Sequence, residues 1–239
     1  MTDILIFTHT EYCPPAHLGE VLDNGGYTYQ VLRADQNQLD GLDLDKPKAV
    51  AIMGGPMSVN DPLPWLHTEV AAIRYLLKRE VPMVGHCLGG QLIAKALGAP
   101  ITSMGYTESG WQPMSRLDQA QPSPWLEHVP DTFTIFQWHG DTFAIPEGAQ
   151  PLLSSPWCPN QGFAWGEKVL ALQGHPEMTE ALITEWLTDW YHLLDPTQPS
   201  QQSKAQMQAQ LQQKVSELNK VAQGFYRRWL ALAGLNPRP

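Results

Sequence analysis

The stretch around Cys87 constrains the fold of this chain more than any other part of the sequence. A short apolar run at residues 81–84 leads into the pattern Gly-x-Cys-x-Gly at 85–89, and an apolar segment that favours a helix follows to Leu97. The order strand, tight turn, helix is that of a nucleophile elbow. In such a turn the first N–H groups of the helix lie beside the sulfur and favour a thiolate. Cys87 is therefore a candidate nucleophile, and a structural thiol in a glycine-rich turn is the alternative.

Apolar runs alternate with segments of helical spacing over the first hundred residues. The segments expected as strands are 4–7, 27–32, 49–53 and 81–84, and those expected as helices are 16–23, 66–79 and 88–97. Strands that alternate with helices form a mainly parallel sheet covered on both faces. Ligands bind such sheets beyond the carboxyl ends of the strands, where Gly54-Gly55 and Cys87 both fall.

Short strand-like runs separated by turn residues follow Pro100, at 132–138, 151–154, 161–165 and 169–173. Such spacing favours an antiparallel or mixed extension of the sheet. A helix is expected over residues 179–194, with Thr179 as its N-cap. The predicted fold class is therefore α/β: a mainly parallel open sheet flanked by helices in flavodoxin-like layers, with a mixed or antiparallel extension.

The composition changes at Pro196, where a stretch rich in Gln, Ser and Pro begins. We expect one domain over residues 1–195, and a Gln-rich linker with a C-terminal amphipathic helix over 196–239. The apolar stripe of this helix is Leu211, Val215, Leu218, Ala222, Phe225, Trp229 and Leu232. We expect the stripe to pack on the domain. Because it also fits heptad spacing, a homodimer contact is the alternative, which Gly224 weakens.

The composition excludes several classes of partner. The 239 residues carry a net charge of −9, with 15 Lys and Arg against 24 Asp and Glu, so no nucleic-acid partner is expected. The sequence has no apolar stretch of membrane length and no signal-peptide pattern, so we expect no membrane association and a cytoplasmic location. With three cysteines in no zinc-like spacing and no nucleotide-binding fingerprint, we expect no metal and no cofactor.

A nucleophilic cysteine needs a base, and an apolar run that ends in Gln-Gly-His-Pro-Glu at residues 173–177 supplies the best candidate. Pro176 favours an extended backbone at His175, and residues two apart in an extended chain point the same way, so Glu177 can reach the ring. His175 would take the Cys87 proton and return one to the leaving amine, while Glu177 would hold its tautomer. The alternatives are an ordinary loop histidine and a solvated glutamate.

Acyl transfer also needs donors for an oxyanion. The backbone N–H of Leu88, directly after the cysteine, is one candidate, and the N–H of Gly55 is the other. Each such donor stabilises the transition state by about 3 kcal/mol. A simple tight turn is the alternative for Gly54-Gly55-Pro56.

Three motifs in this order resemble the class I, triad-type glutamine amidotransferases. They are Gly54-Gly55-Pro56, Gly-His-Cys-Leu-Gly-Gly-Gln at 85–91 and Gly-His-Pro-Glu at 174–177. The resemblance extends from Ile4 to about Leu194. Residues 54–61 and 137–143 look most like the stand-alone proteins related to the amidotransferase domain of GMP synthase.

The resemblance implies hydrolysis of the glutamine side-chain amide through a γ-glutamyl thioester on Cys87, which gives glutamate and ammonia. It also implies that Gln91 meets the α-amino group of the substrate and that the backbone around Trp138 and His139 holds its α-carboxylate. An exposed helix glutamine and ordinary turn residues are the alternatives at these positions. A γ-glutamyl peptidase or hydrolase with the same triad is the alternative activity, and a non-catalytic binding protein is a third interpretation.

The sequence departs from the family pattern at two positions. His86 stands before the cysteine, where an apolar residue is usual, and could tune thiolate formation or access; Gly90 replaces the more common alanine. The chain shows no synthetase domain that would use the ammonia. The expected partners are a small-molecule substrate, glutamine or a γ-glutamyl compound, and a synthetase is left open. Residues 106–111 and 141–155 are expected to line the leaving-group pocket.

Overall fold

The computed structural model describes residues 3–118 and 121–237 of the chain. Within them, nine strands form one sheet in the order β2-β1-β3-β4-β9-β8-β7-β5-β6. The strands that pair in parallel are β2 (Tyr29–Arg33), β1 (Ile4–Thr8), β3 (Ala49–Ile52), β4 (Met83–His86) and β9 (Val169–Leu172). The strands that extend the sheet by antiparallel pairing are β8 (Gly162–Trp165), β7 (Gln150–Ser154), β5 (Ile101–Arg116) and β6 (Thr132–Phe143). The predicted α/β class with its mixed extension is confirmed.

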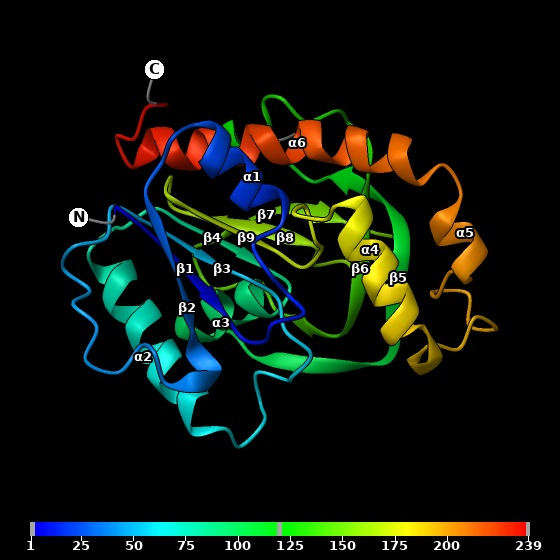
Figure 1. Ribbon diagram of the computed structural model, residues 1–239, viewed down its shortest axis with the longest axis horizontal. Coiled ribbons are helices and arrows are strands. Elements are labelled where there is room, and N and C mark those ends of the chain that lie inside the picture. The colour runs from blue at the N-terminus through cyan, green and yellow to red at the C-terminus, as the bar shows by residue number, and fades with distance from the viewer. Residues whose placement is uncertain (1–2, 119–120, 238–239) are drawn as a thin grey trace.

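Helices cover both faces of the sheet (Figure 1). On one face lie α1 (His17–Asn24) and α6 (Leu211–Leu232), and on the other lie α2 (Pro64–Lys78) and α3 (Leu88–Ala96). Successive side chains of β1 point to opposite faces, so Leu5 and Phe7 join the core under α2 and α3. Ile4 and Ile6 join the core under α1 and α6.

The remaining helical segments lie around the long strands. Figure 1 shows α4 (Glu180–Asp189) beside β5 and β6, and α5 (Lys204–Gln208) before α6. Thr179 caps α4 as predicted, because its hydroxyl accepts a hydrogen bond of 3.2 Å from the N–H of Leu182. Short 3-10 turns are present at Ala34–Gln36, Pro124–Leu126 and Tyr191–Leu193.

One predicted helix extends too far, and one strand was not predicted. The helix expected over 179–194 ends at Asp189 and is followed by the 3-10 turn at Tyr191–Leu193, because Trp190 has a φ of −118°, well away from the value near −63° of a regular α-helix. The longest strand, β5, was not predicted. Gly105, Gly110 and Pro113 interrupt its sequence pattern, and its extended form comes from pairing with β6 across a bulge between Ser103 and Glu108.

The segment after Pro196 is attached to the sheet. The N–H of Ser109 in β5 donates to the carbonyl of Ser200 at 3.0 Å, and the side-chain amide of Gln202 makes two hydrogen bonds to the backbone of Trp111 (2.9 and 2.8 Å). Helix α6 then buries its apolar stripe, including Ala222, Phe225 and Trp229, against the β-sheet core. The C-terminal residues therefore complete one face of the fold.

Candidate active site

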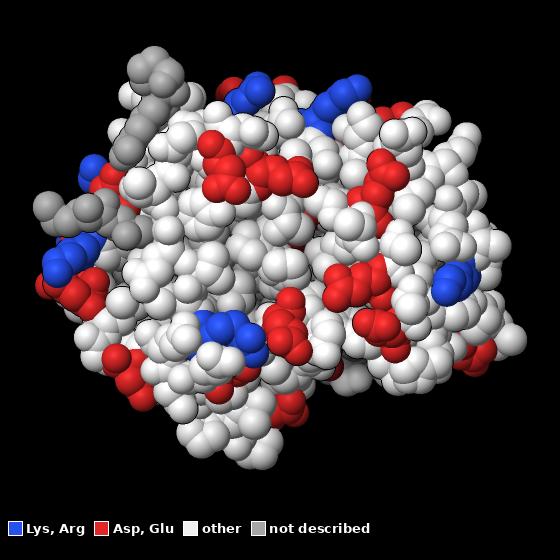
Figure 2. Space-filling view, in the orientation of Figure 1, with Lys and Arg blue, Asp and Glu red and all other residues white. Residues whose placement is uncertain are grey.

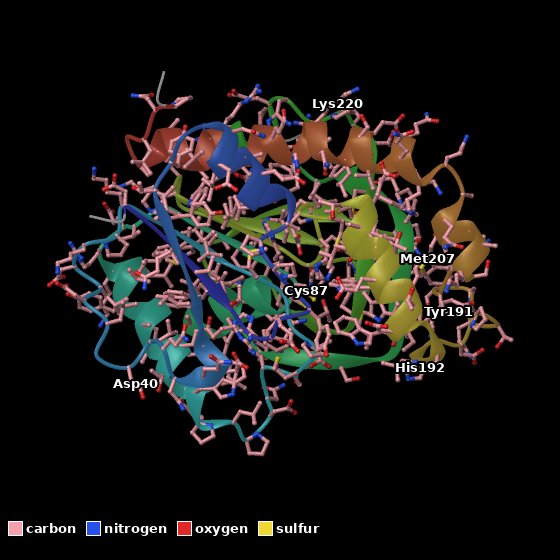
Figure 3. The ribbon with its side chains drawn as sticks, viewed as in Figure 1. Asp40, Cys87, Tyr191, His192, Met207 and Lys220 are labelled. Carbon is pink, nitrogen blue, oxygen red and sulfur yellow. The ribbon has the colours of Figure 1, made fainter. Side chains whose placement is uncertain are left out.

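Cys87 lies in a strained turn between β4 and α3, and Figure 3 shows it near the middle of the molecule. Its backbone has φ 51° and ψ −110°, a conformation that non-glycine residues rarely adopt. The glycines on each side make the turn possible. A Cβ on Gly85 would lie 2.7 Å from the carbonyl carbon of Gly89, and a Cβ on Gly89 would collide with the carbonyl of Ile52. The local sequence therefore builds an elbow that holds the sulfur at the end of the sheet.

His175 and Glu177 follow β9, the neighbour of β4, and so reach the same edge of the sheet. The N–H of His175 donates to the carbonyl of Phe136 at 2.9 Å, which holds the turn against β6. Nδ1 of His175 lies 2.8 Å from Oε1 of Glu177. A Cβ placed on Gly54 would lie 2.9 Å from Cε1 of His175 and 3.7 Å from Cβ of Cys87, so imidazole and thiol meet over this glycine.

Cys87, His175 and Glu177 form a buried group, with side chains that are only 5%, 2% and 2% exposed. Each charged side chain in this group affects the pKa of its neighbour. Burial alone would lower the pKa of His175, but the neighbouring Glu177 carboxylate and Cys87 sulfur raise it to about 10. Burial would likewise raise the pKa of Glu177, but the imidazoles of His175 and His86 hold it well below its usual range. The site therefore favours a protonated His175 beside an ionised Glu177.

A cavity of about 570 Å³ opens beside the sulfur. The predicted site residues that line it are Gly55, Cys87, Leu88, Gln91, Trp138, His139 and His175. Glu177 lies behind His175, outside this lining. A Cβ on Gly55 would lie 2.9 Å from Cδ2 of Leu88, so the two backbone segments expected to donate to an oxyanion are adjacent.

Gln91 is turned inward on α3. Its side-chain Nε2 donates to the carbonyl of Asp141 at 3.2 Å and to Oε1 of Gln173 at 3.3 Å. The imidazole of His139 has its two ring nitrogens 2.8 Å from the Asp141 carbonyl and 2.9 Å from Oε2 of Glu108, so these partners hold its ring in place. The carbonyl of Trp138 faces the sulfur of Cys87 at 4.0 Å.

Trp138 and three aromatic residues that the sequence did not predict form one wall of the cavity. We call Tyr12, Trp138, Trp186 and Trp190 the aromatic wall; their rings contact one another in edge-on or tilted pairs with centroids 5.2–6.5 Å apart. Trp186 also contacts the His175 ring edge-on at 5.0 Å. The spacing of Trp186 and Trp190, one helical turn apart and directly after the His-Pro-Glu motif, was a usable signal.

The expected leaving-group lining was largely wrong. Of residues 106–111 only Thr107 lines the cavity, and of residues 141–155 only Asp141 does. The reason is that residues 108–111 pair with β6, residues 141–143 belong to β6 and residues 150–154 form β7, which places most of these two stretches in the sheet. Met57 and Ser58, from the loop after β3, line the cavity as well, and the Ser58 hydroxyl donates to the Asp141 carboxylate at 2.6 Å.

The described residues contain no group of three or more His, Cys, Asp and Glu side chains placed to hold a metal ion. No helix among them is long and apolar enough to cross a membrane. Figure 2 shows Asp and Glu gathered in several groups over the face drawn, with fewer Lys and Arg between them, a distribution that disfavours an anionic macromolecule there.

Comparison with known proteins agrees with the geometry. Residues 18–192 match the family described as glutamine amidotransferase class-I. A crystal structure of a glutamine amido transferase from Methylobacillus flagellatus superimposes with a TM-score of 0.92 at 33% identity, over 100% of this chain and 98% of that chain. A glutamine amidotransferase structure from Thermotoga maritima, at 24% identity, has the same fold with a TM-score of 0.85, over 96% of this chain and 98% of that chain. The chain belongs to the class-I glutamine amidotransferase family.

Within this family the chain is similar to stand-alone proteins. The putative glutamine amidotransferase-like protein YfeJ of Salmonella typhimurium is 27% identical over 164 residues, which cover 66% of this chain and 68% of that protein. The glutamine-hydrolyzing GMP synthase of Neisseria meningitidis is 26% identical over 170 residues, 68% of this chain but only 32% of the synthase. The chain thus corresponds to about a third of the GMP synthase that it matches.

Proposed function

We propose that this chain is a glutaminase of the amidotransferase type, which hydrolyses the side-chain amide of glutamine to glutamate and ammonia. The observation that carries the proposal is the buried contact of 2.8 Å between His175 and Glu177, next to a cysteine in a strained elbow. A nucleophile, a base and a group that orients the base are the parts that acyl transfer needs.

The reaction follows from these positions. The Cys87 sulfur attacks the amide carbon of glutamine, and the oxygen takes up the negative charge between the N–H groups of Gly55 and Leu88. His175 donates a proton to the amide nitrogen, the C–N bond breaks, and ammonia leaves a γ-glutamyl thioester. His175 then takes a proton from water, which attacks the thioester carbon and releases glutamate and the cysteine sulfur.

Recognition of the amino acid end of the substrate is assigned to Gln91 and to the backbone at Trp138 and His139. Both hydrogen bonds of the Gln91 side chain use Nε2, which leaves Oε1 as an acceptor for an α-ammonium group. The carbonyl of Asp141 holds both Gln91 and the His139 ring, so the two parts of this subsite are tied together.

Release of ammonia from glutamine by the purified chain tests the proposal, with Cys87→Ala as the inactive variant. We expect wild-type turnover and a loss of at least about 10³-fold on removal of the nucleophile. Cys158→Ala is the matched control, because Cys158 is also a buried free thiol but lies outside the cavity lining, and it should retain activity. A wild-type protein that releases no ammonia, or equal activity of Cys87→Ala, would contradict the proposal.

The ammonia would serve an acceptor on another protein. The GMP synthase relatives carry the matching region as about a third of their length, and a synthetase partner for this chain is proposed on that analogy alone. The three cysteines are free thiols in the structure, which fits a reducing compartment, and we propose a cytoplasmic location.

A second candidate function is hydrolysis of γ-glutamyl amides that carry an apolar or aromatic group on the amide nitrogen. His175 donates its proton to the leaving nitrogen, so the substituent on that nitrogen departs past the His175 ring. The ring is in edge-on contact with Trp186, which belongs to the aromatic wall. Aromatic faces bind flat apolar groups well, and free glutamine has none to place there.

The ratio of kcat/KM for γ-glutamyl anilide to that for glutamine separates the two functions. If the anilide is the better substrate, Trp190→Ala should lower its kcat/KM by about 10-fold or more while the value for glutamine changes little. If the ratio of the anilide value to the glutamine value is well below one, and Trp190→Ala does not change it, this second function is excluded and the glutaminase is favoured.

A further inference from the structure

Four buried polar atoms belong to Glu177 and to three residues grouped around it, each from a different part of the chain. They are Nε2 of His17 in α1, Nδ1 of His86 in β4, Oε2 of Glu177 itself and the hydroxyl of Tyr226 in α6, and none makes a hydrogen bond with another described group. Polar atoms are rarely buried in this way without a role. The cluster lies outside the cavity lining, so contact with substrate does not explain it.

The closest contact in this cluster is between His86 and Glu177. Nδ1 of His86 lies 3.0 Å from Oε2 of Glu177, while Oε1 of the same carboxylate faces His175 at 2.8 Å. The His86 contact has the distance of an ion pair without the direction of an aligned hydrogen bond, and the His86 imidazole helps to lower the pKa of Glu177. The two imidazoles therefore hold the two oxygens of one buried carboxylate.

Helix α6 contacts His86 through Tyr226. The Tyr226 ring lies 5.9 Å from the His86 ring and 6.4 Å from the His17 ring, measured between centroids, and Tyr226 is fully buried. The backbone N–H of His17 also donates to the carbonyl of Glu177 at 2.9 Å. Residue 226 lies beyond the matched residues 18–192, so this support comes from outside the part of the chain that the family description covers.

Stability alone is a poor explanation for a histidine at this position. A buried ion pair usually stabilises a fold no more than apolar side chains of similar volume, because both charges lose their hydration. His86 is 1% exposed on a central strand, where an apolar residue would fill the space without that cost. What an apolar residue could not do is attract the second oxygen of Glu177.

We propose that His86 is a positioning residue, which fixes Oε2 of Glu177 so that Oε1 remains directed at His175, and that Tyr226 of the C-terminal helix holds His86 in place. The triad is thereby coupled to α6. This inference rests on the proposed function, because it assumes that His175 acts as the base for Cys87.

Kinetics of His86→Leu and His86→Asn on glutamine test the proposal. We expect His86→Leu to lower kcat by about 10-fold or more with KM changed less than about twofold, because orientation of the base acts in the transition state. Asn carries an N–H donor close to the position of Nδ1, so His86→Asn should recover most of kcat. Equal kcat in wild type and His86→Leu, or a fall in kcat that Asn does not recover, would overturn the proposal.

The role of Tyr226 is tested in the same way with Tyr226→Leu and Tyr226→Phe. Phe keeps the ring against His86 and should stay within about twofold of wild-type kcat, while Leu should lower it several-fold. His128→Leu is the matched control, since His128 also packs on α6, through Val221 and Phe225, and it should leave kcat unchanged. Full activity of a folded Tyr226→Leu would contradict the coupling.

Alkylation of Cys87 by iodoacetamide gives a readout that needs no substrate. The rate depends on the charge and position of His175 beside the sulfur, so His86→Leu should slow it by several-fold while His86→Asn reacts like wild type. If the wild type releases no ammonia from glutamine, the proposed function fails, but this measurement still decides on His86. If His86→Leu is alkylated at the wild-type rate, the positioning role of His86 is excluded even if the protein hydrolyses glutamine.

Discussion

At the scale of single residues, a buried charged pair holds the peptide between Gly54 and Gly55. Nδ1 of His9 lies 2.9 Å from the Gly54 carbonyl, and Nε2 lies 3.0 Å from both carboxylate oxygens of Glu69. Both ring nitrogens face oxygen atoms, an arrangement that favours the protonated ring. Burial would lower the pKa of His9, but the Glu69 carboxylate raises it. In a trans peptide the C=O and the next N–H point in opposite directions, so His9 directs the N–H of Gly55 away from itself.

We therefore predict that the pair His9 and Glu69 orients an oxyanion donor. The double variant His9→Phe with Glu69→Leu removes both charges together and so avoids an unpaired buried charge. It should lower kcat for glutamine by roughly 10–100-fold, less than complete loss of a donor, with little change in KM. Glu69→Gln alone keeps His9 on the Gly54 carbonyl and should stay near wild type. Matched kcat values for the double variant and wild type would exclude the role.

The His175 and Glu177 pair also predicts how stability depends on pH. The pKa of His175 rises from 6.5 to about 10 in the folded protein. Its stabilising effect is therefore complete below pH 6.5 and is lost as the pH rises toward 10. The pKa of Glu177 falls below its usual 4.5, so its effect is complete above pH 4.5 and is lost at lower pH.

The test compares wild type with the double variant His175→Asn and Glu177→Gln. We expect the difference in their free energies of unfolding to depend on pH. Urea unfolding at about pH 6 and about pH 9 measures this gap, which should be larger at the lower pH. Histidines that do not contact Glu177 affect both free energies alike and largely cancel. A gap that grows toward pH 9 would show that the sign is wrong.

At the scale of elements, the terminal helix carries a glycine for a reason that its own sequence does not reveal. A Cβ on Gly224 would collide with the imidazole of His128, whose Nε2 contacts the Val221 carbonyl at 3.0 Å and whose ring meets Phe225 edge-on. In an exposed helix, Gly→Ala adds about 1 kcal/mol of stability. Here we predict that Gly224→Ala destabilises the protein. Overpacking against His128 costs about 1–3 kcal/mol, and the gain in helix propensity offsets only part of that cost.

A double-mutant cycle decides the sign for Gly224. With His128→Ala in place the ring is gone, and Gly224→Ala should then stabilise by about 1 kcal/mol. Thermal or urea unfolding of the four proteins gives the coupling free energy. If Gly224→Ala stabilises the protein with His128 present, the close approach has no energetic consequence.

The elements that the sequence predicts well are those with local signals. The elbow at Cys87 requires glycines at fixed positions, and the strands and helices before Pro100 show their periodicity in short windows. By contrast, β5 is extended because β6 pairs with it, and Gly105 and Gly110 interrupt the sequence pattern from which a strand would be predicted. The aromatic wall joins Tyr12 to α4, which are distant in the chain. Contacts of this kind arise from tertiary packing, which no window of sequence contains.

At the scale of the whole molecule, α6 uses its apolar stripe within the chain. Figure 1 shows it lying along α1 over one face of the sheet. Leu218, Ala222, Phe225 and Trp229 are at most 1% exposed, and Nε1 of Trp229 donates to the Pro82 carbonyl at 3.0 Å, next to β4. The stripe is therefore occupied already, and a homodimer built on it would need α6 to leave this face.

We predict that Trp229→Ala destabilises the fold by about 3–5 kcal/mol without changing the mass in solution. For a chain of this size each kcal/mol corresponds to a fall in Tm of roughly 2–4 °C. Gln213→Ala, an exposed position of the same helix, should change neither quantity. Deleting residues 197–239 should abolish cooperative unfolding, because it uncovers one face of the sheet. A truncated chain that stays folded, at half the molecular mass of the full-length species, would show instead that α6 joins two subunits. The coupling between Tyr226 and the triad would then have to act across the contact between subunits.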